Sequence, residues 1–464
     1  MINKIKKNKK NSVIEGYFFG LFKLNANISL KMMLNNKKSQ NFLYKALLYL
    51  VVFFPLIVVL GSAAINITTA LLIIVLLFYI NITIINQNDF FNNHLFIYFF
   101  FFFLFILINS ILNEQDYQLI IKSIGNFRYL LLSVAIFFVL ENINEEQKKF
   151  LIYFNIILMI FICGDIIYQY FFYKNIFGFK PGMCNDFVTF NDCSRFSGVF
   201  GDELIAGGYL SQVGMLFLFL FYFFDFKKNN PILKKKNILF LGLFLVIIIT
   251  GERNATLIFF LTIIILFFFE KKLLNILLLI SLIVFIIFSL GTFSKKIEQR
   301  YINPIKSLNK LNLPDLYENL IDSPWGHHYE AAIELFLEKP IFGHGPKSFR
   351  VVCEKTKIQK KLKEKNFSYL ACTTHPHNYL LEFLSENGII GGIFYLGFIF
   401  IIFYQIFKLR KNNHPEKIIT IALGSLILAI IFPFKPSGSF LSTYNASMLF
   451  YIIGFYSHYI KKIR

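Results

Sequence analysis

Two histidines and an asparagine form the most chemically suggestive short stretch of the sequence. His375, His377 and Asn378 stand just before a long apolar segment, and Glu382 follows Asn378 by about one helical turn. An imidazole with an ordinary pKa of about 6.5 can accept a proton near neutrality, as the attack of a sugar hydroxyl on an anomeric carbon requires. We predict that His377 is such a base, supported by His375, Asn378 and Glu382. The alternative is a histidine that simply favours a membrane interface.

Two arginines could bind an anion. Arg253 stands in the polar junction 250–254 between two short apolar segments, and Arg195 stands in the loop 193–202. A guanidinium group offers a planar fork of N–H donors that fits phosphate oxygens, and an arginine held at membrane depth is usually functional. Both arginines are therefore candidates for binding phosphate groups. The alternatives are a snorkelling Arg253 paired with Glu252 and an ordinary loop cation at Arg195.

Membrane-spanning helices must position these residues, because apolar blocks dominate the composition. Of the 464 residues, 56% are hydrophobic and 16% are charged, whereas about 25% are charged in ordinary soluble domains. Blocks such as 95–112 and 273–290 are long enough to cross a hydrocarbon core of about 30 Å. In lipid the backbone must satisfy its own hydrogen bonds, so such blocks should be helices. We therefore predict an all-α polytopic membrane protein.

Length and apolarity indicate about twelve spans. They cover residues 43–61, 64–85, 95–112, 124–140, 150–172, 203–224, 238–250, 254–269, 273–291, 388–407, 417–434 and 443–459. The expected parts are a basic cytoplasmic segment at 1–42, spans 1–9 at 43–291, one large outer loop domain at 292–387, and spans 10–12 with a basic cytoplasmic tail at 388–464. Within the first part, residues 17–34 could be an interfacial helix or a disordered tail.

The net charge of +20 is best explained by topology. Lysine and arginine cluster in short segments between the apolar blocks, as the positive-inside rule demands, and this placement argues against nucleic-acid binding. A polybasic contact with anionic lipid is the alternative. Four basic stretches fall on the same side as the basic N-terminal segment, namely 227–236, 271–272, 408–417 and 461–464. The same topology places Arg195, Arg253 and His377 together on the outer face.

The loop 292–387 is the only segment large enough to build a small domain. It contains an expected helix at 329–338, which Pro340, Gly343 and Gly345 should end.

Four of the five cysteines fall in expected outer loops. Cys184 with Cys193, and Cys353 with Cys372, could close small loops in an oxidising compartment. A zinc site is the rival interpretation, although the spacings match no standard ligand pattern. A second possible metal site would combine His327, His328, His344, His375 and His377. Nothing in the sequence fixes the distances between these histidines, so we expect no metal.

Around these motifs the sequence resembles the O-antigen ligase family, membrane proteins that share the Wzy_C domain. The ligase signature is His, then Asn, Ser or Gln, nine residues, Gly, two residues, and then Gly, Thr or Tyr. His377, Asn378, Gly388 and Gly391 match it without a gap. The run 325–349 is similar to the stretch that precedes the histidine in this family.

The arginine motifs carry a looser resemblance to the same family. The junction at 250–253 resembles its turn of small residues and arginine, although Glu252 often has Ser in that place. Arg195 resembles an earlier loop arginine. The similarity covers residues 195–396 by motif and the whole chain by topology.

The resemblance implies a multi-pass protein of the bacterial inner membrane, with its active site and large loop facing the periplasm. Such enzymes transfer a glycan from undecaprenyl diphosphate to the lipid A core in lipopolysaccharide biosynthesis. They are understood as inverting, metal-independent and free of cofactors. By position, His377 would be the base, and Arg195 and Arg253 would hold the diphosphate. The implied partners are the carrier-linked glycan donor, a lipid A core or other glycan acceptor, and the lipid bilayer.

Three other functions stay open at this point. Polysaccharide polymerases and protein O-oligosaccharyltransferases of the same family share the donor and differ in the acceptor. A polysaccharide transporter or flippase is the alternative from another class. It would carry polar residues deep in several spans and repeat symmetry between its halves, whereas the spans here are nearly pure Ile, Leu and Phe.

Overall fold

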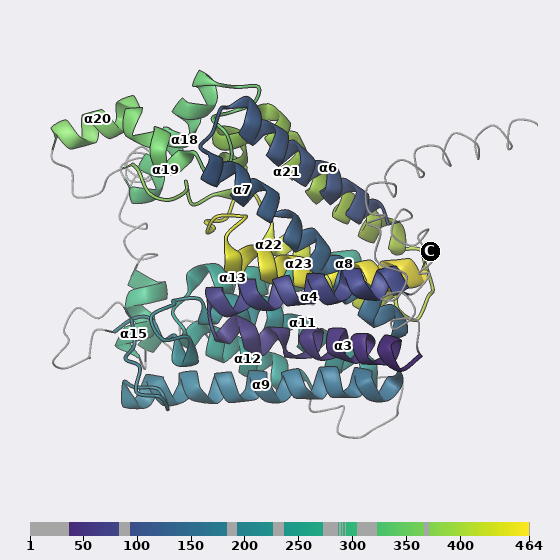
Figure 1. Cartoon of the computed structure of the whole chain (residues 1–464). Helices are drawn as coiled ribbons and strands as arrows, with labels where there is room; N and C mark the ends of the chain where they lie inside the picture. Colours follow the sequence, from purple (N-terminus) through teal and green to yellow (C-terminus); the bar gives the residue numbers. More distant parts are fainter. Residues whose placement is uncertain are drawn as a thin grey trace, which may run out of the picture.

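The computed structural model of the chain contains helices as its only regular elements within the residues that it describes (Figure 1). The described residues are 37–82, 93–182, 193–225, 236–271, 294–303, 323–365 and 371–463, with a few single positions between 286 and 292. An isolated backbone bridge pairs Gly182 with Arg195. The expected all-α class is therefore confirmed.

The first half of the chain supplies long apolar helices. They are α3 (Lys37–Val59), α4 (Ser62–Ile82), α6 (His94–Leu112), α7 (Tyr117–Gly125), α8 (Phe127–Asn142) and α9 (Glu145–Phe172). A second group surrounds the arginine motifs. It comprises α10 (Ala206–Tyr209), the π-helical turn η2 (Leu210–Gly214), α11 (Met215–Asp225), α12 (Lys236–Ile249), α13 (Arg253–Phe269), α15 (Lys295–Ile297) and the π-helical turn η4 (Glu298–Ile302).

The last part of the chain holds the segment expected to form the loop domain and three further apolar helices. Its elements are α18 (Pro324–Glu338), α19 (Phe349–Val352), α20 (Lys357–Glu364), α21 (Tyr379–Leu409), α22 (Lys417–Ile430) and α23 (Thr443–Ile463).

The described helices agree with a polytopic membrane protein. Seven helical segments are long and apolar enough to cross a bilayer, and α12, α13 and α22 are shorter apolar helices. Every expected span except the ninth falls on one of the helices above. The ninth, 273–291, lies almost wholly outside the described residues, so the number of spans stays a prediction.

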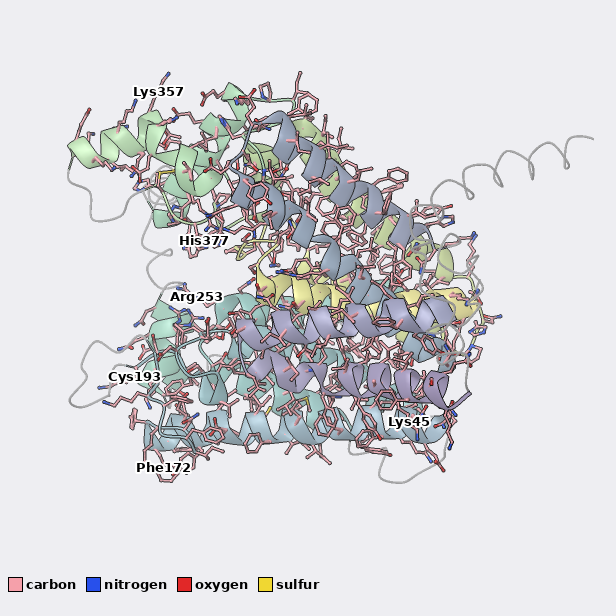
Figure 2. All side chains as sticks on the ribbon, viewed as in Figure 1. Lys45, Phe172, Cys193, Arg253, Lys357 and His377 are labelled. Atoms are coloured by element: carbon pink, nitrogen blue, oxygen red, sulfur yellow. A yellow bond between two sulfur atoms is a disulfide. The ribbon has the colours of Figure 1, made fainter. Side chains whose placement is uncertain are left out.

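The two ends of the molecule differ in the residues that they carry. In Figure 2, Phe172, Cys193, Arg253 and His377 lie toward one end, and Lys45 lies toward the other. The C-terminus lies at the Lys45 end in Figure 1, whereas α15 and α18 to α20 lie at the opposite end. This arrangement agrees with a topology in which the expected catalytic motifs share one face.

Helix α21 begins earlier than the expected tenth span. It starts at Tyr379 rather than at 388, because Asn378 caps it by accepting a hydrogen bond from the Leu381 N–H at 3.1 Å. Its first turns carry the buried polar residues Glu382, Ser385, Glu386 and Asn387. A hydropathy criterion rejects such turns, so the sequence pattern placed the start of this helix too late.

Gly388 interrupts α21 at the point where the loop after α18 packs against it. Its φ of 63° and ψ of −163° lie outside the helical region. The Ile389 N–H donates to the Pro340 carbonyl at 2.8 Å, and the Gly345 N–H donates to the Glu386 carbonyl at 2.7 Å. A Cβ atom at position 388 would lie 2.2 Å from the Ile341 carbonyl oxygen. Glycine is therefore required here both for conformation and for space.

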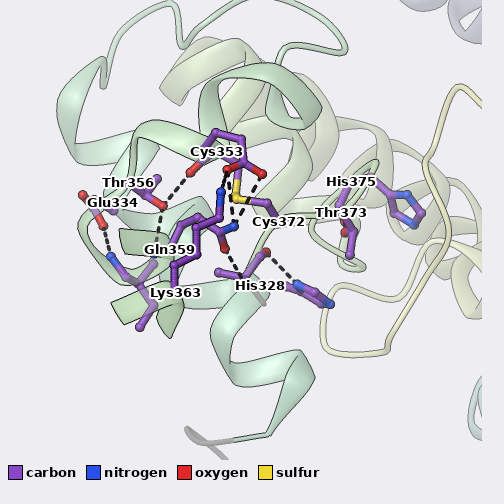
Figure 3. Close-up of a disulfide and its surroundings, with 12 residues drawn as sticks. His328, Glu334, Cys353, Thr356, Gln359, Lys363, Cys372, Thr373 and His375 are labelled. Atoms are coloured by element: carbon purple, nitrogen blue, oxygen red, sulfur yellow. Dashed lines mark hydrogen bonds and ion pairs between the residues drawn. A yellow bond between two sulfur atoms is a disulfide. The ribbon is translucent and has the colours of Figure 1, made fainter. Parts of the chain in front are cut away.

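The loop domain is a small helical unit closed by a disulfide (Figure 3). The helix expected at 329–338 is confirmed as part of α18, which begins at Pro324 after the N-cap Ser323. The expected pairing of Cys353 with Cys372 is also confirmed. The domain has its own small core, formed by Ala331, Ala332, Leu335, Phe349, Cys353, Ile358, Leu362 and Ala371. The other expected pair cannot be described, because Cys184 lies outside the described residues.

Gly388→Ala tests whether the helix break fixes the loop domain. We expect destabilisation by at least about 1–3 kcal/mol, the usual cost of a strained backbone conformation, and further loss from the clash with Ile341. Thermal unfolding of the detergent-purified protein and limited proteolysis of the loop domain would measure it. Gly242→Ala is the matched control, since a Cβ there meets nothing within 4 Å. Equal stability of the two variants would contradict the prediction.

Candidate active site

His377 lies in a cluster of aromatic rings at the edge of the loop domain. Its φ of 57° is unusual for a residue other than glycine, and the Ser437 N–H donates to its carbonyl at 2.8 Å. The ring centroid of His377 lies 4.2 Å from that of His375, 5.2 Å from that of His328 and 5.0 Å from that of Trp325. The structure therefore places His375 and His377 side by side and adds two rings from α18.

Both neighbouring imidazoles titrate below the ordinary range. Burial, together with the charge that His328 could carry, lowers the pKa of His377 to about 4, whereas the Ser437 backbone opposes the shift. Burial and His377 lower the pKa of His375 to about 4 in the same way. Both rings are consequently neutral near pH 7, so each keeps a nitrogen lone pair that can accept a proton.

Asn378 and Glu382 hold the loop between α22 and α23 against the start of α21. The Asn378 Nδ2 donates to the Pro433 carbonyl at 2.7 Å. The Glu382 carboxylate accepts hydrogen bonds from the Ser439 hydroxyl at 2.5 Å and from the Phe440 N–H at 2.9 Å. This loop also bonds to the His377 backbone. The two residues therefore support the position of His377 through the loop.

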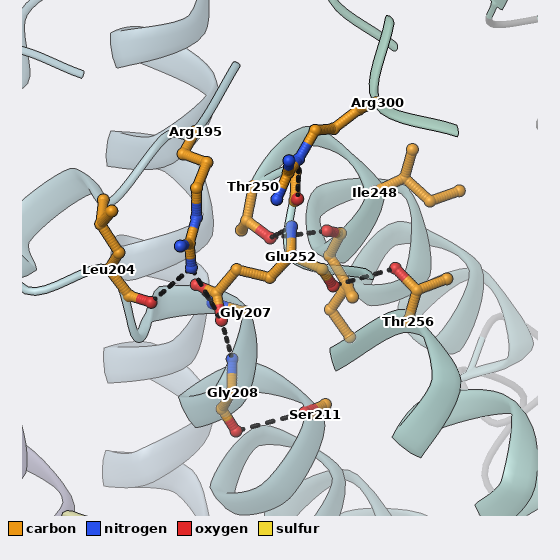
Figure 4. Close-up of polar contacts among 12 residues, drawn as sticks. Arg195, Leu204, Gly207, Gly208, Ser211, Ile248, Thr250, Glu252, Thr256 and Arg300 are labelled. Atoms are coloured by element: carbon orange, nitrogen blue, oxygen red, sulfur yellow. Dashed lines mark hydrogen bonds and ion pairs between the residues drawn. The ribbon is translucent and has the colours of Figure 1, made fainter. Parts of the chain in front are cut away.

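A close backbone contact joins the two arginine motifs. Gly251, with a φ of 71°, is pressed so tightly against the 194–196 segment that a Cβ would lie 2.1 Å from the Ser194 carbonyl oxygen. The Phe196 N–H donates to the Thr250 carbonyl at 3.2 Å. The loop that carries Arg195 thus lies directly on the turn between α12 and α13, as Figure 4 shows.

Glu252 pairs with Arg195 in this turn. Its carboxylate lies 3.9 Å from the Arg195 Nη2 and accepts hydrogen bonds from the N–H groups of Gly207 at 2.8 Å and Gly208 at 3.2 Å. The Arg195 Nη2 also donates to the Leu204 carbonyl at 2.8 Å. Burial raises the pKa of Glu252, while Arg195 opposes that rise.

Arg253 differs from Arg195 in its surroundings. Its side chain is exposed at the start of α13, and the described ion pairs connect Glu252 to Arg195 rather than to Arg253. The alternative of a snorkelling Arg253 neutralised by Glu252 is therefore not the arrangement found. Among the described residues, an exposed positive charge therefore stands beside the one that Glu252 pairs with.

The histidine cluster and the arginine turn lie at the same end of the molecule. Figure 2 places His377 and Arg253 on facing sides of the gap between the upper and lower groups of helices. Among the residues that the structure describes, no group of three or more His, Cys, Asp or Glu side chains is placed to hold a metal ion.

Part of the chain matches the model of a known protein family. Residues 238–396 match the family model described as O-antigen ligase, Wzy_C. The chain contains a Wzy_C domain. No curated protein matches the sequence. The Wzy_C domain extends from the start of α12 into α21, so it contains Arg253 and His377, whereas Arg195 precedes it. The family comprises membrane enzymes of the O-antigen ligase and polymerase type.

Arg300 lies within the residues that match the Wzy_C model, but it belongs to none of the motifs found in the sequence. Its Nε donates to the Gly251 carbonyl at 2.8 Å. Burial lowers its pKa, and the positive charges of Arg253 and Arg195 lower it further, so the three guanidinium groups are neighbours. A signal was available in the sequence: Arg300 follows Lys295 and Lys296 in an expected outer segment, where the positive-inside rule disfavours cations.

Lys435 is a second missed residue near the site. Only 2% of it is exposed, and its Nζ lies 5.0 Å from the centre of the Tyr379 ring. Burial lowers the pKa of Lys435 to about 7. It lies in the loop that bonds to His377. The sequence signal was a single lysine between Pro433 and Pro436 in a loop without any other charged residue.

Lys435→Met should raise the thermal stability, most strongly below pH 7. The amine has an ordinary pKa of 10.5 and a folded pKa of about 7, so the unfolded chain binds more protons between these values and stability rises with pH there. Below pH 7 both states are protonated and the full cost of burying the charge remains. Melting temperatures at pH 6 and pH 9 would test this, with exposed Lys360→Met as the control. A lower melting temperature for Lys435→Met at pH 6 would contradict the prediction.

Proposed function

We propose that this Wzy_C protein is an O-antigen ligase of the bacterial inner membrane. It transfers a glycan from undecaprenyl diphosphate to the lipid A core on the periplasmic side, in lipopolysaccharide biosynthesis. The observation that carries the proposal is the shared location of the arginine turn and a neutral histidine at one end of a helical membrane protein. The match to the Wzy_C family supports the same reaction class.

On the donor side, Arg195 and Arg253 hold the diphosphate. Their guanidinium groups offer charge-assisted hydrogen bonds to phosphate oxygens. The leaving undecaprenyl diphosphate gains negative charge as its bond to the sugar breaks. Fixed cations stabilise that developing charge most effectively when they are already in place, as the contact between the loop of Arg195 and the turn at Gly251 provides.

On the acceptor side, His377 takes the proton of the attacking hydroxyl. The acceptor oxygen forms a bond to the anomeric carbon, the carbon–oxygen bond to the diphosphate breaks, and the proton moves to the imidazole. Attack opposite to the leaving group inverts the anomeric configuration. The low pKa of His377 keeps it unprotonated before the reaction, and a bound diphosphate would favour the imidazolium that forms.

Trp325 could provide the surface on which the acceptor sugar lies. Its side chain is 45% exposed, and its ring stands perpendicular to that of His377 at 5.0 Å. An aromatic face beside the base would orient the apolar face of a sugar while leaving its hydroxyl toward His377.

The decisive experiment gives the purified full-length protein a carrier-linked glycan with two acceptors offered separately. Product on the lipid A core would support the ligase. Product only on a second carrier-linked glycan would identify a polymerase and overturn the proposed acceptor. Movement of the glycan across vesicles without transfer would support a transporter instead.

His377→Ala should abolish transfer, with a loss of roughly 10²–10⁴-fold, while the protein still inserts. Because the base must be unprotonated and its pKa is lowered to about 4, kcat/KM of the unmodified protein should persist to pH 5 and fall nearer to pH 4 than to 6.5. Exposed His94→Ala is the control. Normal transfer by His377→Ala, or an acid limb near pH 6.5, would refute the assignment of the base.

Arg195→Ala and Arg253→Ala should each abolish transfer, and Arg253→Lys should restore only part of it. Lysine keeps the positive charge but cannot offer the two-pronged guanidinium fork. Steady-state kinetics with varied donor would show the loss, and exposed Lys174→Ala serves as a control on the same face. Full activity in Arg253→Lys would show that charge alone suffices and that the fork is not used.

A further inference from the structure

The segment 294–303 is fastened at its start to α9 and near its end to α13, beside the arginine turn. The Ser294 and Tyr170 hydroxyls lie 2.6 Å apart, which ties the start of the segment to α9. The Tyr301 and Thr256 hydroxyls lie 3.0 Å apart, which ties its end to α13. Arg300 precedes Tyr301 and is therefore held in place by the fold.

Like charges gather around this turn. The positive charges of Arg253 and Arg195 both act on Arg300, and the Glu252 carboxylate opposes part of their effect. Gathering three cations is unfavourable unless something compensates for it. A diphosphate diester, with one negative charge on each phosphate, would compensate for that repulsion.

Within the part of the chain that the structure describes, Arg195 and Arg300 also keep donors without a hydrogen-bond partner. The Arg300 Nε is bonded to the Gly251 carbonyl, and this bond orients the group while its two terminal nitrogens bond to none of the described residues. The Arg195 Nε is buried without a hydrogen-bond partner within that same part of the chain. Buried polar groups are nearly always bonded, so an unbonded donor beside exposed Arg253 indicates a ligand that completes the set.

A purely structural role would explain only part of this arrangement. A hydrogen bond to the Gly251 carbonyl needs one N–H group, and a neutral side chain could supply it without repulsion from two arginines. The positive charge of Arg300 is therefore unexplained by the bond that holds it.

We infer that Arg300 is a third ligand of the donor diphosphate, delivered to the turn by the segment 294–303. The inference rests on the proposed function, since it names a further binding residue for the same donor. Arg195 and Arg300 are anchored by the protein backbone, and exposed Arg253 completes the set. Together the three groups can contact both phosphates.

Arg300→Gln separates the two roles, because its amide can still donate to the Gly251 carbonyl while the charge is removed. Binding of undecaprenyl diphosphate to the full-length protein in nanodiscs would be measured at several salt concentrations. We expect Arg300→Gln to weaken binding at least about tenfold and to flatten its salt dependence, since one charged contact is lost. Binding of undecaprenyl monophosphate should change less. Lys295→Gln, which removes an exposed cation from the same segment, should bind as the unmodified protein does.

A second variant covers the case in which Arg300→Gln fails to fold. Arg300→Lys keeps the charge without the fork, so diphosphate binding should weaken several-fold with less change in salt dependence. Binding by Arg300→Gln or Arg300→Lys equal to that of the unmodified protein would overturn the inference. If Arg253→Ala then still lost diphosphate binding, the proposed function would stand without Arg300. Absence of diphosphate binding in the unmodified protein would overturn both.

Discussion

In lipid, every backbone N–H and C=O group must find a partner within the protein, and this constraint governs where irregular backbone can lie. The break at Gly388 is acceptable because Pro340 accepts the hydrogen bond that the interrupted helix leaves open. The turn at Gly251 is acceptable because the segment of Ser194 closes over it. At both irregular sites, loops from distant parts of the chain pack together at the same end of the molecule. Polar and charged side chains can cluster only where such loops meet.

The two clusters at that end have opposite electrostatic character. Around His377 the rings are half-buried and neutral, because desolvation disfavours their charged forms. Around Gly251 the arginine side chains are permanently charged, because guanidinium keeps its proton under all ordinary conditions. A transfer reaction needs this division, since the base must be unprotonated while the leaving group needs fixed positive charge. The separation of the clusters allows each to keep its own environment.

Sequence reasoning succeeded where a local pattern carries the information. Apolar length identified the helices, and the spacing of Cys353 and Cys372 within one expected outer loop indicated a disulfide that the structure contains. It failed where a role depends on contacts between distant segments. Arg300 belongs to no recognised motif, and its neighbours Arg195 and Gly251 are far away along the chain. Lys435 likewise contacts a distant part of the chain, since its Nζ lies over the ring of Tyr379 at the start of α21.

Most residues of the ligase signature shape the start of α21, and only His377 is proposed to take part in the chemistry. Asn378 caps α21, Gly388 allows its break, and Gly391 leaves no room for a Cβ, which would lie 2.3 Å from the Asn387 Cβ. A spacing of this kind is therefore needed to build the helix start that presents His377. The same pattern would be required even if another residue performed the proton transfer, so the signature alone cannot assign the base.

The carboxylate of Glu252 has two roles, because it holds the backbone of α10 and it offsets the charge of Arg195. Its carboxylate accepts the N–H groups of Gly207 and Gly208 at the start of α10 and lies against Arg195. Removing that carboxylate would free positive charge for an anion, but it would also release the contact that holds α10 against the arginine turn. Because burial raises the pKa of Glu252, protonation could relieve part of the negative charge while the oxygen atoms still accept both hydrogen bonds. The turn can therefore become more positive without losing its shape.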